Sequence, residues 1–125
     1  MTVALCLLAS LLPPCDRGGH AETVPPPRGG QAVVLTLVRQ LKRFPAWVCI
    51  HNHEGAWNDR GDPYWGGLQM DRGFMLAYGR DMIRKHGGWA DTWTPAEQIT
   101  VAERAYMSGR GFTPWPNTAR ACGVL

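Results

Sequence analysis

The stretch PAWVCIHNHEGAW, at residues 45–57 of the 125-residue chain, decides the fold. Proline is tolerated in the first turn of a helix and glycine commonly follows the last one. We therefore expect a helix over residues 45–54 that ends at Gly55. Positions separated by three and by seven residues lie on the same helical face. That face would carry two large apolar side chains and one acid: Trp47, Ile50 and Glu54.

The neighbouring segments predict more helix and one short β element. Residues 31–43 have apolar side chains at helical spacing, and Pro45 is expected to separate them from the next helix. Residues 55–67 are rich in glycine, aspartate and asparagine, which predicts turns, with a short strand or hairpin at Tyr64-Trp65. Residues 70–86 are expected to form one helix.

The clearest local signal is a capping box, in which Thr94 is the N-cap, Pro95 opens the helix and Glu97 is the third helical residue. This helix is expected to run to about Ser108. Residues 111–125 are expected to be irregular. Together the segments predict a mostly α domain of α+β character, compact and helical, with a short β-hairpin or loop element beside a cleft.

The N-terminal residues predict export. Residues 1–12 are almost wholly apolar and too short to span a bilayer, which is typical of the apolar region of a signal peptide. No basic residue precedes them, which departs from that pattern. Gly19-His20-Ala21 offers small residues for cleavage. We expect a signal peptide over residues 1–21, a linker over 22–30 and a folded domain over 31–125 with its core at 44–125. A buried N-terminal helix is the alternative.

Four cysteines are present. Cys6 would leave with the signal peptide, and Pro13-Pro14 argue against lipidation of Cys15. Cys49 and Cys122 remain, and an isolated pair in an exported domain is typical of a disulfide that closes a long loop. Two unrelated buried thiols are the alternative in a cytosolic protein.

Charge and aromatic content narrow the partners. The net charge of +3 is compatible with an acidic polymer such as bacterial wall, and no basic run interleaved with aromatics predicts nucleic-acid binding. Six tryptophans in so short a chain fit a sugar-binding cleft, although tryptophan also fills the cores of small domains.

Glu54 is the candidate acid. The C-terminal end of a helix carries partial negative charge, and apolar neighbours desolvate a carboxyl group, so both oppose ionisation. A carboxyl that keeps its proton can act as general acid at a glycosidic oxygen. A solvated glutamate at a frayed helix end is the alternative, but the aromatic, glycine-rich loop that follows favours function.

His51-Asn52-His53-Glu54 suggests a metal site, but alternate residues on a helix point to nearly opposite sides. We therefore expect no metal and no cofactor. Glu97, Glu103 and Arg104 are expected to serve in capping or in ion pairs.

Four blocks occur in order along the chain: residues 47–57, residues 64–70 (YWGGLQM), residues 93–104 (WTPAEQITVAER), and Trp115-Pro116 with Cys122-Gly123. This series resembles the transglycosylase-like domain of actinobacterial resuscitation-promoting factors, over roughly residues 44–125. The resemblance implies a lysozyme-like fold and a secreted, wall-located enzyme. It implies cleavage of the β-1,4 bond between N-acetylmuramic acid and N-acetylglucosamine in peptidoglycan.

The resemblance also implies residue roles. Glu54 matches the catalytic glutamate of the family. The substrate contacts would be Gln69, Tyr64, Trp65 and Trp57. A Cys49–Cys122 bridge resembles the family disulfide, although family members often place the first cysteine immediately before the glutamate. We expect a monomer without stable membrane association after signal removal.

Two mechanisms and one further function stay open. A hydrolase normally needs a second carboxylate, and the nearby acids are Asp59, Asp62 and Asp71. Loop aspartates are more often turn formers, so the sequence favours a lytic transglycosylase, in which one glutamate serves both steps. The other function is a non-catalytic peptidoglycan-binding module, which would keep the aromatic cleft and need no acid.

Overall fold

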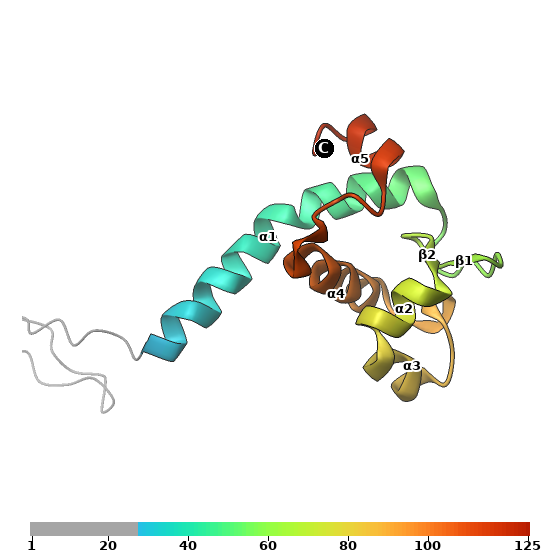
Figure 1. Cartoon of the computed structure of the whole chain (residues 1–125), viewed down its shortest axis with the longest axis horizontal. Helices are drawn as coiled ribbons and strands as arrows, with labels where there is room; N and C mark the ends of the chain where they lie inside the picture. The colour runs from blue at the N-terminus through green and yellow to red at the C-terminus, as the bar shows by residue number, and fades with distance from the viewer. Residues whose placement is uncertain (1–27) are drawn as a thin grey trace, which may run out of the picture.

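The computed structural model describes residues 28–125, so the expectations for the signal peptide, Cys6, Cys15 and residues 22–27 of the linker lie outside it. The described chain is mostly helical with a small antiparallel sheet (Figure 1), which confirms the expected fold class. Its elements are α1 (Arg28–Glu54), β1 (Tyr64–Trp65), β2 (Met70–Asp71), α2 (Arg72–Tyr78), α3 (Arg80–His86), the 3-10 turn η1 (Ala90–Thr92), α4 (Pro95–Ala105), the wide turn η2 (Tyr106–Arg110) and α5 (Pro116–Ala121).

The expected break at Pro45 is wrong, because α1 runs through it as one helix. An internal proline removes a helical hydrogen bond and costs about 3 kcal/mol. Contacts on both sides offset this cost. Arg43 and Trp47 both donate hydrogen bonds to the carboxylate of Glu103 on α4, so one group fixes the helix before and after the proline. The helix also begins at Arg28, so the last three residues of the expected linker are helical.

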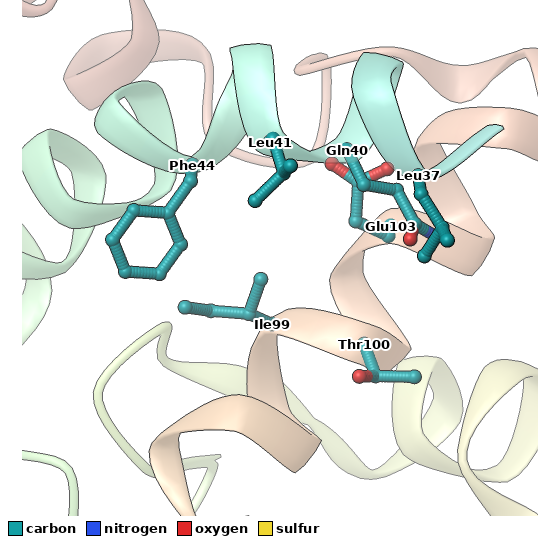
Figure 2. A pocket seen from close by; sticks show the side chains of 7 residues that line it. All are labelled: Leu37, Gln40, Leu41, Phe44, Ile99, Thr100 and Glu103. Carbon is teal, nitrogen blue, oxygen red and sulfur yellow. The ribbon is translucent and has the colours of Figure 1, made fainter. Parts of the chain in front are cut away.

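The first half of α1 projects away from the rest of the domain (Figure 1), and its apolar face is not core. Seven apolar side chains between residues 33 and 44 are 41–72 % exposed: Val33, Val34, Leu35, Leu37, Val38, Leu41 and Phe44. A shallow groove separates this face from Ile99 on α4 (Figure 2). Among the described residues, no helix combines the length and apolarity needed to cross a bilayer.

The core begins in the second half of α1. Trp47 is fully buried, and its ring centroid lies 4.9 Å from Phe112 and 5.1 Å from Trp115. Phe74 on α2 extends this cluster, 5.4 Å from Trp115. Four of the six tryptophans are buried, so most serve the core rather than a sugar cleft: Trp47, Trp65, Trp93 and Trp115.

The single helix expected over residues 70–86 is wrong. Met70 pairs with Trp65 in the hairpin, and Asp71 then caps α2 by accepting a 2.7 Å hydrogen bond from the amide of Phe74. Gly79 leaves the helical conformation and separates α2 from α3. A Cβ at Gly79 would lie 2.7 Å from the ring of Trp93, so the absence of a side chain there lets a core tryptophan approach the backbone.

The capping box at Thr94 and Glu97 is confirmed. The helix that it opens ends at Ala105, and the chain continues as η2 to Arg110. Within η2, Gly109 has a φ of 100°. The expectation that residues 111–125 are irregular is wrong in part, because Pro116 opens the short helix α5. Proline suits the first position of a helix, since its missing amide hydrogen would have no partner there.

Candidate functional site

Glu54 lines an open cavity of about 290 Å³ at the C-terminal end of α1. The other walls come from distant parts of the chain: Tyr64, Gln69, Pro114, Trp115, Pro116 and Asn117. Two of the predicted contact residues, Tyr64 and Gln69, are therefore brought to Glu54. The cavity also includes four C-terminal residues that sequence reasoning did not assign to it.

Gln69 is held in a constrained turn. Its φ is 49°, in the left-handed region that residues other than glycine seldom adopt. Its Nε2 donates to the carbonyl of Gly66 (2.9 Å) and to Oδ2 of Asp59 (2.8 Å). Both amide hydrogens are thus used, which leaves the carbonyl oxygen Oε1 to accept a hydrogen bond from a ligand. A Cβ at Gly55 would lie 3.0 Å from this Nε2, so the glycine after Glu54 lets Gln69 approach.

The turn that carries Gln69 is held by contacts of its backbone with Gln98 on α4 and His51 on α1. The amide of Gly67 donates to Oε1 of Gln98 (2.8 Å), and the Gly67 carbonyl lies 3.1 Å from Nδ1 of His51. A Cβ at Gly67 would lie 2.5 Å from the ring of Trp57 and 2.6 Å from His51. A side chain does not fit there, which explains the second glycine of the Gly66-Gly67 pair.

Tyr64 and Trp65 have opposite roles because successive side chains of a strand point to opposite faces. Tyr64 is exposed and lines the cavity, whereas Trp65 is 8 % exposed and packs against Trp89 at 5.7 Å between ring centroids. The structure therefore does not bring Trp65 into this cavity, since its ring belongs to the core, and its role as a substrate contact stays a prediction.

Trp57 likewise does not line the cavity. Its ring stacks on His51 at 3.8 Å between centroids and covers Gly67, and its carbonyl accepts a hydrogen bond from Nε2 of Gln98. Trp57 thus supports the turn from behind, and its predicted substrate contact stays a prediction. His51 faces this support.

The C-terminal segment forms the opposite wall. Thr118 on α5 donates a 2.8 Å hydrogen bond from its hydroxyl to Oε1 of Glu54. Trp115 ties the two walls together, because its Nε1 donates to the carbonyl of Leu68 at 2.6 Å. Thr118 was missed by sequence reasoning. The signal in the sequence is Pro116, which predicts the start of a helix shortly before Cys122.

The disulfide Cys49–Cys122 joins α1 to α5 across 73 residues of sequence, and it confirms the predicted bridge. His53 lies beside it, with the ring nitrogen and both sulfur atoms within 4.8 Å of one another. The sulfur atoms are bonded to each other and are not thiolates, so this group does not offer a metal site while the bridge is intact.

Among the described residues, Glu54 is the one carboxylate that lines this cavity. Asp59 accepts hydrogen bonds from Gln69 and from the amide of Gly61, as a turn former does. Asp71 caps α2, and Asp62 is exposed in the loop.

The groove between α1 and α4, of about 160 Å³, is a weaker candidate site (Figure 2). Its walls are mostly apolar, and the acid in it, Glu103, is already bound by Arg43 and Trp47.

The chain matches no protein-family model and no curated protein sequence. The geometry around Glu54 therefore carries the functional argument.

Proposed function

We propose that this protein cleaves the glycan strands of bacterial peptidoglycan at the MurNAc-β-1,4-GlcNAc bond, with Glu54 as the general acid. The observation that carries the proposal is the position of Glu54, a lone carboxylate in an open cavity that is also lined by two aromatic and two amide side chains. The ordered motifs that resemble the transglycosylase-like domain support the same substrate.

The cavity suits part of a polymer. It is open rather than enclosed, and about 290 Å³ lies at the lower end of the range for ligand sites. Tyr64 offers an exposed ring for the apolar face of a sugar, and Gln69 offers a carbonyl oxygen for a hydroxyl or amide hydrogen. Asn117 lies on the facing wall. These groups can hold one sugar unit while the strand continues beyond both ends.

The single carboxylate favours the lytic route. Glu54 gives its proton to the glycosidic oxygen as the bond from that oxygen to C1 of the muramyl unit breaks. The resulting carboxylate takes the proton of the muramyl 6-hydroxyl, and this oxygen then forms the new bond to C1. The product carries a 1,6-anhydro ring, no water is consumed, and Glu54 regains its proton. General acid–base catalysis of this kind contributes about 10²–10⁴-fold.

The proposal places the enzyme in the exported fraction, at the cell wall, where disulfides persist. The Cys49–Cys122 bridge supports that location. Peptidoglycan is the proposed partner, and neither metal nor cofactor is needed for the route above.

The direct test is release of soluble fragments from purified peptidoglycan by wild type, Glu54→Gln and Asp62→Asn. Glutamine keeps the size of the side chain but has no proton to give, so we expect at least about a 100-fold loss. Asp62 is an exposed loop acid outside the cavity and serves as the matched control, with activity near wild type. Equal activity in wild type and Glu54→Gln would reject the catalytic role.

Mass spectrometry of the products separates the two mechanisms. An anhydromuramyl end supports the lytic route, and a reducing muramic acid end rejects it in favour of hydrolysis. Cosedimentation with peptidoglycan tests the alternative binding module. Binding by wild type and Glu54→Gln without fragment release from either would identify a non-catalytic module.

A further inference from the structure

The hydroxyl of Thr118 has two acceptors and one hydrogen. Its Oγ1 lies 2.8 Å from Oε1 of Glu54 and 3.4 Å from the carbonyl oxygen of Trp115. A hydroxyl donates one hydrogen bond and can accept two. The shorter distance indicates donation to Glu54 in this structure, with the Trp115 carbonyl available if the hydroxyl rotates.

We propose that Thr118 is a positioning residue for Glu54, whose hydroxyl holds Oε1 against α5 and so presents the other carboxyl oxygen, Oε2, to the scissile bond. This inference rests on the proposed function of Glu54. Thr118 need not contact the substrate, since it acts through the carboxyl group that it holds.

The contact serves both protonation states of Glu54. When the carboxyl is ionised it can only accept, so Thr118 donates to Oε1 across the 2.8 Å contact. When it is protonated, the carbonyl oxygen is the better acceptor of the carboxyl group, so donation to Oε1 favours the proton on Oε2, the oxygen that would face the leaving group. If the proton moves to Oε1, the hydroxyl can accept it in a hydrogen bond and turn its own hydrogen to the Trp115 carbonyl.

Thr118 is itself held firmly enough for this role. The disulfide fixes Cys122, one helical turn further along, to Cys49 on α1. Trp115, three residues earlier, is bonded through its ring nitrogen to Leu68. Ala119 is fully buried between these anchors. The β-branched threonine side chain also has few rotamers, so its hydroxyl stays near Glu54.

The test compares Thr118→Val, Thr118→Ser and Thr113→Val. Valine keeps the shape and removes the hydroxyl, and serine restores it. Thr113 is the matched control, because it is exposed and its hydroxyl bonds, within residues 28–125, only to the Arg110 carbonyl. On purified peptidoglycan, we expect Thr118→Val to lose about tenfold in kcat with KM within about twofold. Thr118→Ser should recover most of this loss, and Thr113→Val should match wild type.

The pH–rate profile gives a readout that a purely structural role would not move. A donated hydrogen bond stabilises the carboxylate, so its loss lets Glu54 keep its proton to higher pH. We expect the alkaline limb of the Thr118→Val profile to move to higher pH, and that of Thr118→Ser to stay near wild type.

A second measurement is independent of turnover. Carbon NMR of the Glu54 carboxyl, assigned by its absence in Glu54→Gln, should show the same upward shift of the titration midpoint in Thr118→Val. If wild type cleaves nothing, the enzyme proposal fails while this titration still tests the contact. A Thr118→Val protein with the wild-type profile and midpoint overturns the inference, as does a Thr118→Ser protein that behaves like Thr118→Val. If Thr118→Val does not fold, the wild-type and Thr118→Ser midpoints decide, and a difference above about 0.5 unit counts against the inference.

Discussion

Gln98 accepts a 2.8 Å hydrogen bond from the backbone amide of Gly67, and this links the core helix α4 to the turn that carries Gln69. The same side chain donates from Nε2 to the carbonyls of Trp57 (2.8 Å) and Ala90 (2.7 Å). Gln98 is fully buried, so these backbone groups have no water to replace it. One amide therefore holds three loops that meet behind the candidate site.

We expect Gln98→Leu to lower the free energy of unfolding by about 3–5 kcal/mol, because it leaves several buried backbone groups without partners at about 1–3 kcal/mol each. Denaturant unfolding measures the loss. Gln40→Leu, on the partly exposed half of α1, is the control and should change stability by less than about 0.5 kcal/mol. A loss below about 1 kcal/mol in Gln98→Leu would show that the loops are held by other contacts.

The ion pair of Arg43 and Glu103 gives a second prediction. Glu103 is 4 % exposed, Arg43 donates to both its oxygens, and Glu103 in turn raises the pKa of Arg43 through this hydrogen bond. Arg43→Met leaves the carboxylate buried with only the Trp47 indole as partner. We expect destabilisation of about 3–5 kcal/mol by denaturant unfolding.

The exposed pair of Arg104 and Asp81 is the matched control for this ion pair. Both side chains are about two-fifths exposed, so Arg104→Met should cost no more than about 1 kcal/mol. The double variant Arg43→Met/Glu103→Met should be less destabilised than Arg43→Met alone, because it removes the buried charge. Equal costs for the buried and the exposed pair would contradict the argument.

Reduction of the disulfide should destabilise the protein by about 4 kcal/mol, because the bridge closes a loop of 73 residues. Unfolding with and without a reductant, and of Cys49→Ala/Cys122→Ala, measures this effect. Activity should fall further than stability predicts, because α5 would no longer hold Thr118 against Glu54. Full activity in the folded double variant would show that α5 is placed without the bridge.

Acid should weaken the junction of α3 and α4. Hydrogen bonds from the Lys85 ammonium and from the Thr94 amide lower the pKa of Glu97 to about 2, from an ordinary value of 4.5. A depressed folded-state pKa means that this stabilisation is complete above about 4.5 and is lost as the pH falls toward 2. Melting temperature between pH 6 and pH 2, at about one-unit steps, tests this.

Glu97→Gln is the matched variant for the acid prediction. It keeps an oxygen for the capping hydrogen bond but has no charge to titrate. Its melting temperature should fall less steeply over the same pH range. Identical slopes in wild type and Glu97→Gln would assign the acid sensitivity to other carboxylates, among them Asp81, whose pKa Arg104 lowers to about 2.

Some features could be predicted because a few neighbouring residues determine them. The capping box needs only Thr94, Pro95 and Glu97, and the hairpin needs a turn-rich loop before Tyr64-Trp65. The same local reasoning was wrong at Pro45, where contacts of Arg43 and Trp47 with a residue on α4 outweigh the local cost of a proline. Local propensity is a weak prior when tertiary contacts are worth several kcal/mol.

The sequence by itself determined the helical class, the capping residues and the candidate acid Glu54, and it favoured a bridge between Cys49 and Cys122. Only the tertiary structure decided which residues share its cavity. It buried Trp65, placed Trp57 behind the turn, and brought Thr118 to Glu54 from 64 residues away. The physical reason is that helix capping and turn formation depend on a few neighbouring residues. Packing of the aromatic core instead sets contacts between distant segments, which the local sequence of either segment does not predict.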